Sequence, residues 1–293
     1  MINHILICPI CKKSLVKKEK NFECLKYHKF PIEDNIGILV SNPDEHFNLL
    51  EKQMHGKEDW YKNDQISSYD SGPYKTHLRK RREYVQNIIE EFLNGGKAEK
   101  ILDVGCGDGS NLRWLSEFTD NLCGTDYNLL RLKRAEKITK KLEKNTKLFV
   151  ANILSLPFLE NSFDIIFFNH VIEHIVEDEV ALKKIFDITK KGGIVILGTP
   201  NEGALSWKFA YWLEPRIKNK TDHVNFYTEN SISKIAKNVG FKIREVKHMG
   251  WGVPIWTMDA RIRKYKILDN LLEKFGKRFF KKQATSLYLI LEK

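Results

Sequence analysis

Short runs of apolar residues alternate along the chain with longer stretches in which apolar residues recur every three or four positions. The first pattern is typical of buried strands and the second of amphipathic helices, so the alternation favours an α/β fold. Strands are expected at 100–104, "NLCGTD" (121–126), "FDIIFFN" (163–169), "GGIVILGTPN" (192–201) and "SLYLILEK" (286–293). Helices are expected over 78–93, from Ser110 onward, and across the segment with Leu182, Ile185 and Ile188 on one face.

Composition indicates the cellular compartment of the protein and the classes of molecule that it could bind. No apolar run approaches the roughly 20 residues that cross a bilayer, and the N-terminal residues do not have the pattern of a signal peptide. Five cysteines without an export signal indicate a reducing compartment, so we expect a cytoplasmic protein. The net charge of +11 favours nucleic acid, anionic lipid or anionic small molecules as partners, although a Lys-rich composition alone is a weak indicator.

The first 40 residues carry a candidate metal site. Cys8 and Cys11 form one close pair, and Cys24 and His28 form a second pair after a 12-residue spacer. Thiolates and an imidazole at these spacings suit a tetrahedral zinc ion. The alternative is that the cysteines are ordinary small residues and His28 a surface histidine. The spacing resembles the zinc ribbon of certain ribosomal RNA guanine-N1 methyltransferases, and "HKFPIEDNIGILV" (28–40) is expected to be its closing strand.

Residues 41–77 are polar and irregular, so we expect a linker with one or two short helices. The main domain is then expected over 78–293.

A glycine-rich turn follows the first strand of this domain. In "LDVGCGDGS", the glycines at 105, 107 and 109 lie between the expected strand and helix, where a ligand can approach the backbone. Asp126 ends the next strand and can accept hydrogen bonds from ribose hydroxyls. Ser110 stands where a dinucleotide fingerprint needs glycine, and Asp103 would repel a pyrophosphate. A cationic ligand with an amino-acid tail suits Asp103 better.

"LDVGCGDGS" with "GTDYN" resembles a class I S-adenosylmethionine-dependent methyltransferase, over nearly all of 98–293. The resemblance implies a Rossmann-like, seven-stranded, mostly parallel sheet with a reversed last strand, behind the small N-terminal zinc ribbon. The cofactor-binding residues that it implies are Asp103, Gly105, Gly107, Asp126, Tyr127, Asn152, Ile153 and Asn169. Asp103 would lie near the amino-acid end of the cofactor, Asp126 on the ribose, and Tyr127, Asn152 and Ile153 around the adenine. Asn169 would lie beside the sulfonium. Alternatively, Asn152 caps a turn and Asn169 a helix.

A His-x-x-Glu-His pentad follows the fourth strand. On a helix this spacing is typical of a zinc peptidase, but the surrounding pattern indicates no such fold. The segment instead resembles that of ubiquinone-biosynthesis O-methyltransferases, some of which carry Glu-x-x-Glu-His as ligands for a divalent ion. His170, Glu173 and His174 are therefore a candidate cation site. Alternatively, Glu173 and His174 shape the loop that covers the cofactor. His170 is then a general base, or a semi-buried histidine without a catalytic role.

His223, in "HVNFYT", precedes a helix that Thr228 is expected to cap. By the same resemblance it lies near the substrate entrance, as a catalytic residue or as an anchor of its loop. Trp207, Tyr211 and Trp212 recur at helical spacing, which suits either an apolar pocket or internal packing.

A basic segment over about 250–283 precedes the last strand. Between 261 and 283 there are nine Lys or Arg and two acids, a net charge of +7, and the apolar residues keep a helical period. Such a helix can lie on an anionic membrane, which would make the protein peripheral to it, or bind RNA phosphates. It can also be a lid with a solvated basic side.

The expected activity is methyl transfer from S-adenosylmethionine to an oxygen of a small molecule, lipid or glycan. The alternative is a ribosomal or transfer RNA methyltransferase that uses the zinc ribbon for recognition. A third reading is a cofactor-binding scaffold that activates a partner.

Overall fold

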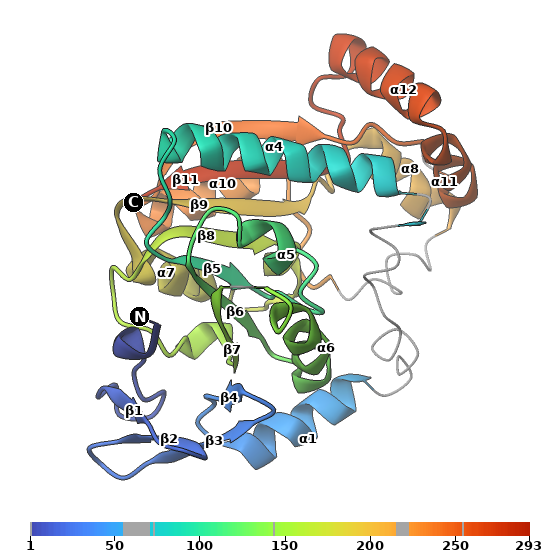
Figure 1. Ribbon diagram of the computed structural model, residues 1–293. Helices are drawn as coiled ribbons and strands as arrows, with labels where there is room; N and C mark the ends of the chain where they lie inside the picture. Colours follow the sequence, from blue (N-terminus) through green and yellow to red (C-terminus); the bar gives the residue numbers. More distant parts are fainter. Residues whose placement is uncertain (1, 55–70, 73, 143, 215–222, 254) are drawn as a thin grey trace. The chain divides into compact units, whose positions relative to one another are not determined.

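A computed structural model describes residues 2–54, 71–72, 74–142, 144–214, 223–253 and 255–293 (Figure 1). The chain divides into two compact units. The first comprises 1–65, 95–167 and 183–194, and the second comprises 66–94, 168–182 and 195–293. Two strands run from the first unit into the second, β8 (Phe163–Asn169) and β9 (Thr189–Pro200).

The first unit contains the parallel strands β5 (Ile101–Val104) and β6 (Asn121–Asp126), which the apolar runs predicted, and β7 (Asn145–Val150), where no strand was predicted. Neighbouring strands follow the order β4-β7-β6-β5-β8-β9. β5 is buried along its whole length, as expected of a central strand with both faces covered. The helices of this part are α5 (Leu112–Leu115), α6 (Leu129–Thr139) and α7 (Asp178–Ile188), whose first residues belong to the second unit.

The N-terminal module joins this sheet. It consists of a 3₁₀ turn, η1 (Ile2–Ile5), and four strands, β1 (Leu15–Lys17), β2 (Asn21–Cys24), β3 (Lys29–Glu33) and β4 (Ile36–Ile38). The expectation of one closing strand over 28–40 was wrong, because Asp34 and Asn35 both have positive φ and form a tight hairpin between β3 and β4. β4 then pairs in parallel with β7, with Ile36 opposite Leu148.

A helix follows this module, as the polar pattern of 41–77 predicted. It is α1 (Pro43–Met54), and Figure 1 shows it in blue beside the N-terminal strands. Residues 55–70 and 73, which form much of the expected linker, lie outside the described residues.

The second unit contains the end of the sheet. Its strands are β10 (Lys242–Met249) and β11 (Ser286–Glu292), in the order β9-β11-β10, and β11 runs antiparallel to β10 as the expected reversal requires. The helices here are α4 (Lys75–Leu93), α8 (Leu205–Leu213) and α10 (Glu229–Val239). Thr228 caps α10, as predicted, through a reciprocal pair of hydrogen bonds with Ser231.

The basic segment between β10 and β11 forms two helices instead of one. They are α11 (Trp256–Lys264) and α12 (Lys266–Phe279), and the extended backbone of Tyr265 separates them. Both helices pack against α4. Among the described residues, no helix is long and apolar enough to span a membrane.

Candidate functional site

The glycine-rich turn after β5 has a backbone that only small residues tolerate. Gly107 and Gly109 have φ of 52° and 84°. A Cβ atom at Gly107 would lie 2.5 Å from the guanidinium of Arg131, and one at Gly109 would lie 2.9 Å from the Cα of Ala135. The turn therefore depends on glycine both for its conformation and for its close contact with α6.

Asp126 stands at the carboxyl end of β6 and is held by backbone donors. Its Oδ2 accepts a hydrogen bond from the N–H of Gly107 at 2.8 Å, and its Oδ1 accepts one from Asn128 at 2.8 Å. These bonds fix the carboxylate beside the glycine-rich turn, as the sequence predicted. Each carboxylate oxygen retains a lone pair for a further donor such as a ribose hydroxyl.

Asp103 is a buried carboxyl group in β5. It is 1% exposed, and its Oδ2 has no hydrogen-bond partner among the described residues. Burial, and then the charge of Asp126, raise the pKa of Asp103 well above its ordinary value. Because buried polar atoms normally have partners, this oxygen fits a ligand with a cationic donor, such as the amino group of S-adenosylmethionine.

Tyr127, directly after β6, is covered by a residue from α1. The ring centroids of His46 and Tyr127 lie 4.0 Å apart, and His46 Nε2 lies 2.8 Å from the carbonyl oxygen of Tyr127. Burial lowers the pKa of His46, so the neutral ring donates this hydrogen bond. No motif in the sequence indicated this contact.

The two asparagines have different surroundings. Asn152 Oδ1 accepts a hydrogen bond from Leu154 N at 2.9 Å and caps the short turn η2 (Ile153–Ser155), which was one of its two predicted roles. Asn169, at the end of β8, is in the second unit. Its Oδ1 is buried beside Gly198 and has no hydrogen-bond partner among the described residues, so it is available to a ligand.

The His-x-x-Glu-His pentad is not on an α-helix. His170 has a φ of 55°, and a single 3₁₀ turn, η3, spans Ile172–His174. His170 Nε2 lies 3.2 Å from Arg81 Nη1, which can only donate, so Nδ1 carries the ring hydrogen and donates to Glu173 Oε1 at 3.1 Å. Burial favours protonation of Glu173, but the hydrogen bond from His170 and the proximity of His174 lower its pKa overall.

His223 joins this cluster from another segment. Ligand atoms of Glu173, His174 and His223 all lie within 4.8 Å of one another, a set that differs from the predicted one by His223 in place of His170. His223 Nδ1 lies 3.2 Å from Glu202 Oε1. The carboxylate of Glu202 thus orients the imidazole, as carboxylates do for catalytic histidines.

A cavity of about 640 Å³ lies within the second unit. α4, α8 and α11 contribute to its walls. Among its lining residues are Arg81, His170, Trp207, Ala210, His223 and Val253. A cavity that combines apolar side chains with three histidines, His77, His170 and His223, is suited to a ligand that has an apolar body and a titratable group.

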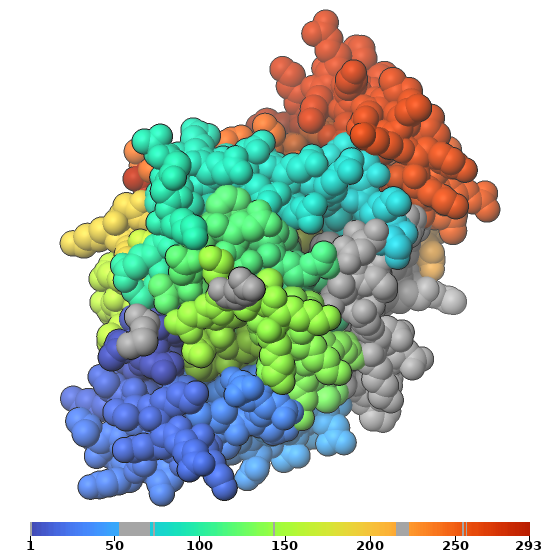
Figure 2. All heavy atoms as spheres, viewed as in Figure 1, coloured from blue at the N-terminus to red at the C-terminus, as the bar shows by residue number. Residues whose placement is uncertain are grey.

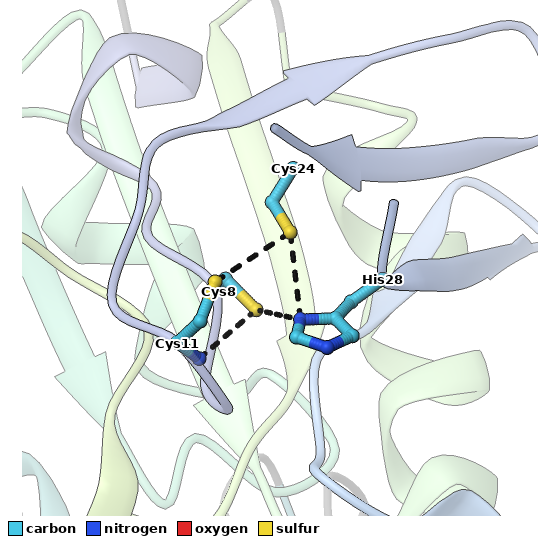
Figure 3. A group of neighbouring side chains, drawn as sticks. All are labelled: Cys8, Cys11, Cys24 and His28. Carbon is cyan, nitrogen blue, oxygen red and sulfur yellow. Dashed lines mark hydrogen bonds between the residues drawn. The ribbon is translucent and has the colours of Figure 1, made fainter. Parts of the chain in front are cut away.

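The four predicted metal ligands converge in the N-terminal module (Figure 3). The Sγ–Nδ1 distances from Cys8 and Cys24 to His28 are 3.4 and 3.5 Å, and the Sγ atoms of Cys11 and Cys24 lie 3.6 Å apart. A backbone hydrogen bond from Lys13 contributes most to lowering the pKa of Cys11 to about 6. The donor set is therefore compact and rich in thiols.

Comparison with known proteins defines the class. A model of the methyltransferase-domain family matches residues 77–246, more than half of the chain, so the chain belongs to this family. It is 30% identical over 159 residues to phosphoethanolamine N-methyltransferase 2 of Caenorhabditis elegans, covering 49% of this chain and 36% of that protein. It is 26% identical to 2-methyl-6-phytyl-1,4-hydroquinone methyltransferase of Synechocystis, covering 53% of this chain and 50% of that protein.

The fold agrees with this family. N-methyltransferase NodS from Bradyrhizobium japonicum, solved with S-adenosyl-L-homocysteine, has a TM-score of 0.55 at 15% identity, covering 81% of this chain and 96% of that chain. The chain thus carries a methyltransferase domain, as the sequence predicted. The chain spans only 36% and 50% of the length of the two relatives above.

Proposed function

We propose that this methyltransferase modifies an oxygen of a small molecule or lipid whose apolar part occupies the cavity of the second unit. The observation that carries the proposal is the placement of His170 and His223 in the wall of a cavity that Trp207 and Ala210 also line. The relative that acts on a phytyl hydroquinone supports an acceptor of this kind. A phenol-like or alcohol hydroxyl suits a neutral histidine as proton acceptor.

We assign the general base to His223. Its Nδ1 faces Glu202, so the Nε2 side of the ring is the one that can receive a proton from the acceptor. The carboxylate would stabilise the imidazolium that results. His170 is the second catalytic candidate, but its two nitrogens are engaged by Arg81 and Glu173. In this proposal it contacts and orients the acceptor.

The cofactor supplies an activated methyl group. Asp103 would bind its amino group, Asp126 its ribose hydroxyls, and Gly105 and Gly107 would let it pass close to the backbone. Tyr127, Asn152 and Ile153 would surround the adenine, and Asn169 would lie beside the sulfonium. The buried oxygen of Asp103 that lacks a described partner supports its assignment.

We further propose a structural zinc ion on Cys8, Cys11, Cys24 and His28. A tetrahedral site with bonds of about 2.3 Å to sulfur and 2.0 Å to nitrogen places its ligand atoms about 3.5–3.8 Å apart. The three distances between 3.4 and 3.6 Å in this cluster are close to that spacing.

The test uses purified protein and methyl-tritiated S-adenosylmethionine with an extract from cells that lack this protein. We expect label in the lipid or small-molecule fraction, and none with a His223→Gln variant that still binds S-adenosylhomocysteine. Label confined to RNA would refute the proposal and favour the RNA alternative.

A further inference from the structure

Helix α12 is oriented with its polar side inward. Asp269, Glu273 and Gly276 recur at spacings of four and three residues, so they share one face of the helix, and all three are buried. A surface helix ordinarily packs its apolar stripe on the core and exposes its polar residues. α12 has the reverse arrangement.

Specific partners hold this polar face in place. Asp269 forms ion pairs with Lys80 of α4 and with Arg263 of α11, whose Nη1 lies 3.0 Å from Asp269 Oδ1. Glu273 Oε1 accepts a hydrogen bond from the N–H of Gly250 at 3.1 Å. Arg263 itself is 2% exposed. Because a buried carboxylate without a partner is strongly unfavourable, these contacts determine which face of α12 points outward.

The outward face is an apolar stripe. We define the α12 stripe as five exposed residues: Ile267, Leu268, Leu271, Phe275 and Phe279. Leu271 is 57% exposed and Phe279 is 64% exposed, and the rings of Phe275 and Phe279 lie 4.9 Å apart. In Figure 2 the helix, in red-orange, stands at the surface beside the teal α4. A stripe of this size on a helix that is already anchored by its opposite face needs a partner that can bury it.

Charge identifies the kind of partner. Residues 261–283 contain nine Lys or Arg and two acids. Both acids, Asp269 and Glu273, are buried on the inner face, so the exposed charge of this segment is entirely positive. Exposed Lys274, Lys277 and Arg278 lie on the same helix as the stripe. Positive charge beside exposed aliphatic and aromatic side chains is the pattern of a helix that lies on an anionic bilayer.

A second helix repeats the pattern of exposed apolar groups. On α8, Phe209 is 44% and Trp212 is 73% exposed, with ring centroids 5.5 Å apart. Trp at such positions is favoured at the membrane–water interface. α8 and α11 both border the cavity of the second unit.

We propose that the α12 stripe and its flanking Lys and Arg residues dock this protein on the surface of an anionic lipid bilayer. The helix lies in the interface and does not span it. Exposed aliphatic residues favour a bilayer over RNA, because nucleic acid binds basic and aromatic groups but offers little surface that can bury Ile and Leu. The inference goes beyond the proposed function, since it concerns binding and holds for any acceptor.

The test is co-sedimentation of the full chain with vesicles of phosphatidylcholine alone or of equal parts phosphatidylcholine and phosphatidylglycerol. We expect binding to the anionic vesicles that weakens as salt is raised. A double variant, Phe275→Ser with Phe279→Ser, should lower the partition coefficient at least about tenfold. Lys274→Gln with Arg278→Gln should lower it roughly 25-fold, since each basic residue near an anionic surface contributes about fivefold.

Matched controls are Leu25→Ser, at a residue 81% exposed in the N-terminal module, and Lys20→Gln. Both should bind like the wild type, and thermal unfolding should confirm that all variants are folded. Absence of vesicle binding would overturn the proposal, as would binding that the α12 variants do not change. Binding to polyuridylate that depends on Lys274 and Arg278 but not on Phe275 and Phe279, without vesicle binding, would assign the surface to RNA.

Discussion

Replacement of Asp103 by Asn should lower the affinity for the cofactor but raise the stability of the ligand-free protein. The carboxyl group is 1% exposed, and one of its oxygens has no hydrogen-bond partner among the described residues. Hydrogen bonds to charged groups contribute about 1.5–3 kcal/mol. Loss of the carboxylate should therefore raise the Kd for S-adenosylhomocysteine roughly 10- to 150-fold, since about 1.4 kcal/mol is a factor of ten.

Without ligand, the same variant should be more stable. Burial raises the pKa of Asp103 well above 3.8, so the folded protein binds more protons here than the unfolded chain does. The contribution of Asp103 to the stability of the wild type therefore falls as pH rises from 3.8 through the raised pKa, and this contribution should be absent in Asp103→Asn. At neutral pH the variant should gain about 1–2 kcal/mol, because it no longer buries an unsatisfied carboxyl.

Calorimetric titration and urea unfolding measure the two effects. The matched control is Asp108→Asn, because Asp108 is also buried but pairs with Arg131 at 3.1 Å and Arg134 at 3.4 Å. It should lose about 3–5 kcal/mol of stability, as expected when one partner of a buried pair is removed. Unchanged ligand affinity in Asp103→Asn, or a loss of its ligand-free stability, would refute the reasoning.

Three further predictions concern other parts of the chain. Cys24→Ser should abolish zinc content by elemental analysis and lower the Tm, and normal metal content in this variant would contradict the assigned ligand set. The contribution of His77 to protein stability should decrease as pH falls below 6.5. Burial, and then the charge of Arg81, hold the pKa of His77 well below that value, so the unfolded chain takes up the proton first. Urea unfolding of His77→Gln should therefore show a weaker pH dependence. Glu202→Gln should lower kcat by about tenfold or more with little change in the KM of the acceptor, since it acts through His223; an effect confined to KM would argue for a role in binding.

Structural features that depend on residues close together along the chain were predicted correctly. The glycine-rich turn, Asp126 and the Thr228 cap each depend on neighbours within one strand–turn–helix segment, where residue type and spacing decide the conformation. The strands β5, β6, β8, β9 and β11 followed from their apolar runs for the same reason, whereas β7 and β10 were not predicted. The hairpin at Asp34 and Asn35 was missed, although two residues that tolerate positive φ stand there in sequence.

Contacts between distant segments were not predictable. His46 reaches Tyr127 across 81 positions of the chain, and His223 reaches Glu173 from another loop. The helical spacing of apolar residues in α12 correctly predicted an amphipathic helix, but the sequence could not show which face of the helix is buried. That choice depends on Lys80 and Arg263, which lie on two other helices.

The pairing of β4 with β7 would link the proposed zinc site to the folding of the methyltransferase domain. Ile36 is synthesised long before Leu148, so β4 cannot pair with β7 until the intervening segment has been synthesised. Such non-local pairing slows folding. During that interval, and in any fragment that lacks the module, the edge of β7 is left open to other chains. If the proposed zinc site is required for the module to fold, supply of zinc to the nascent chain would then govern the yield of folded protein.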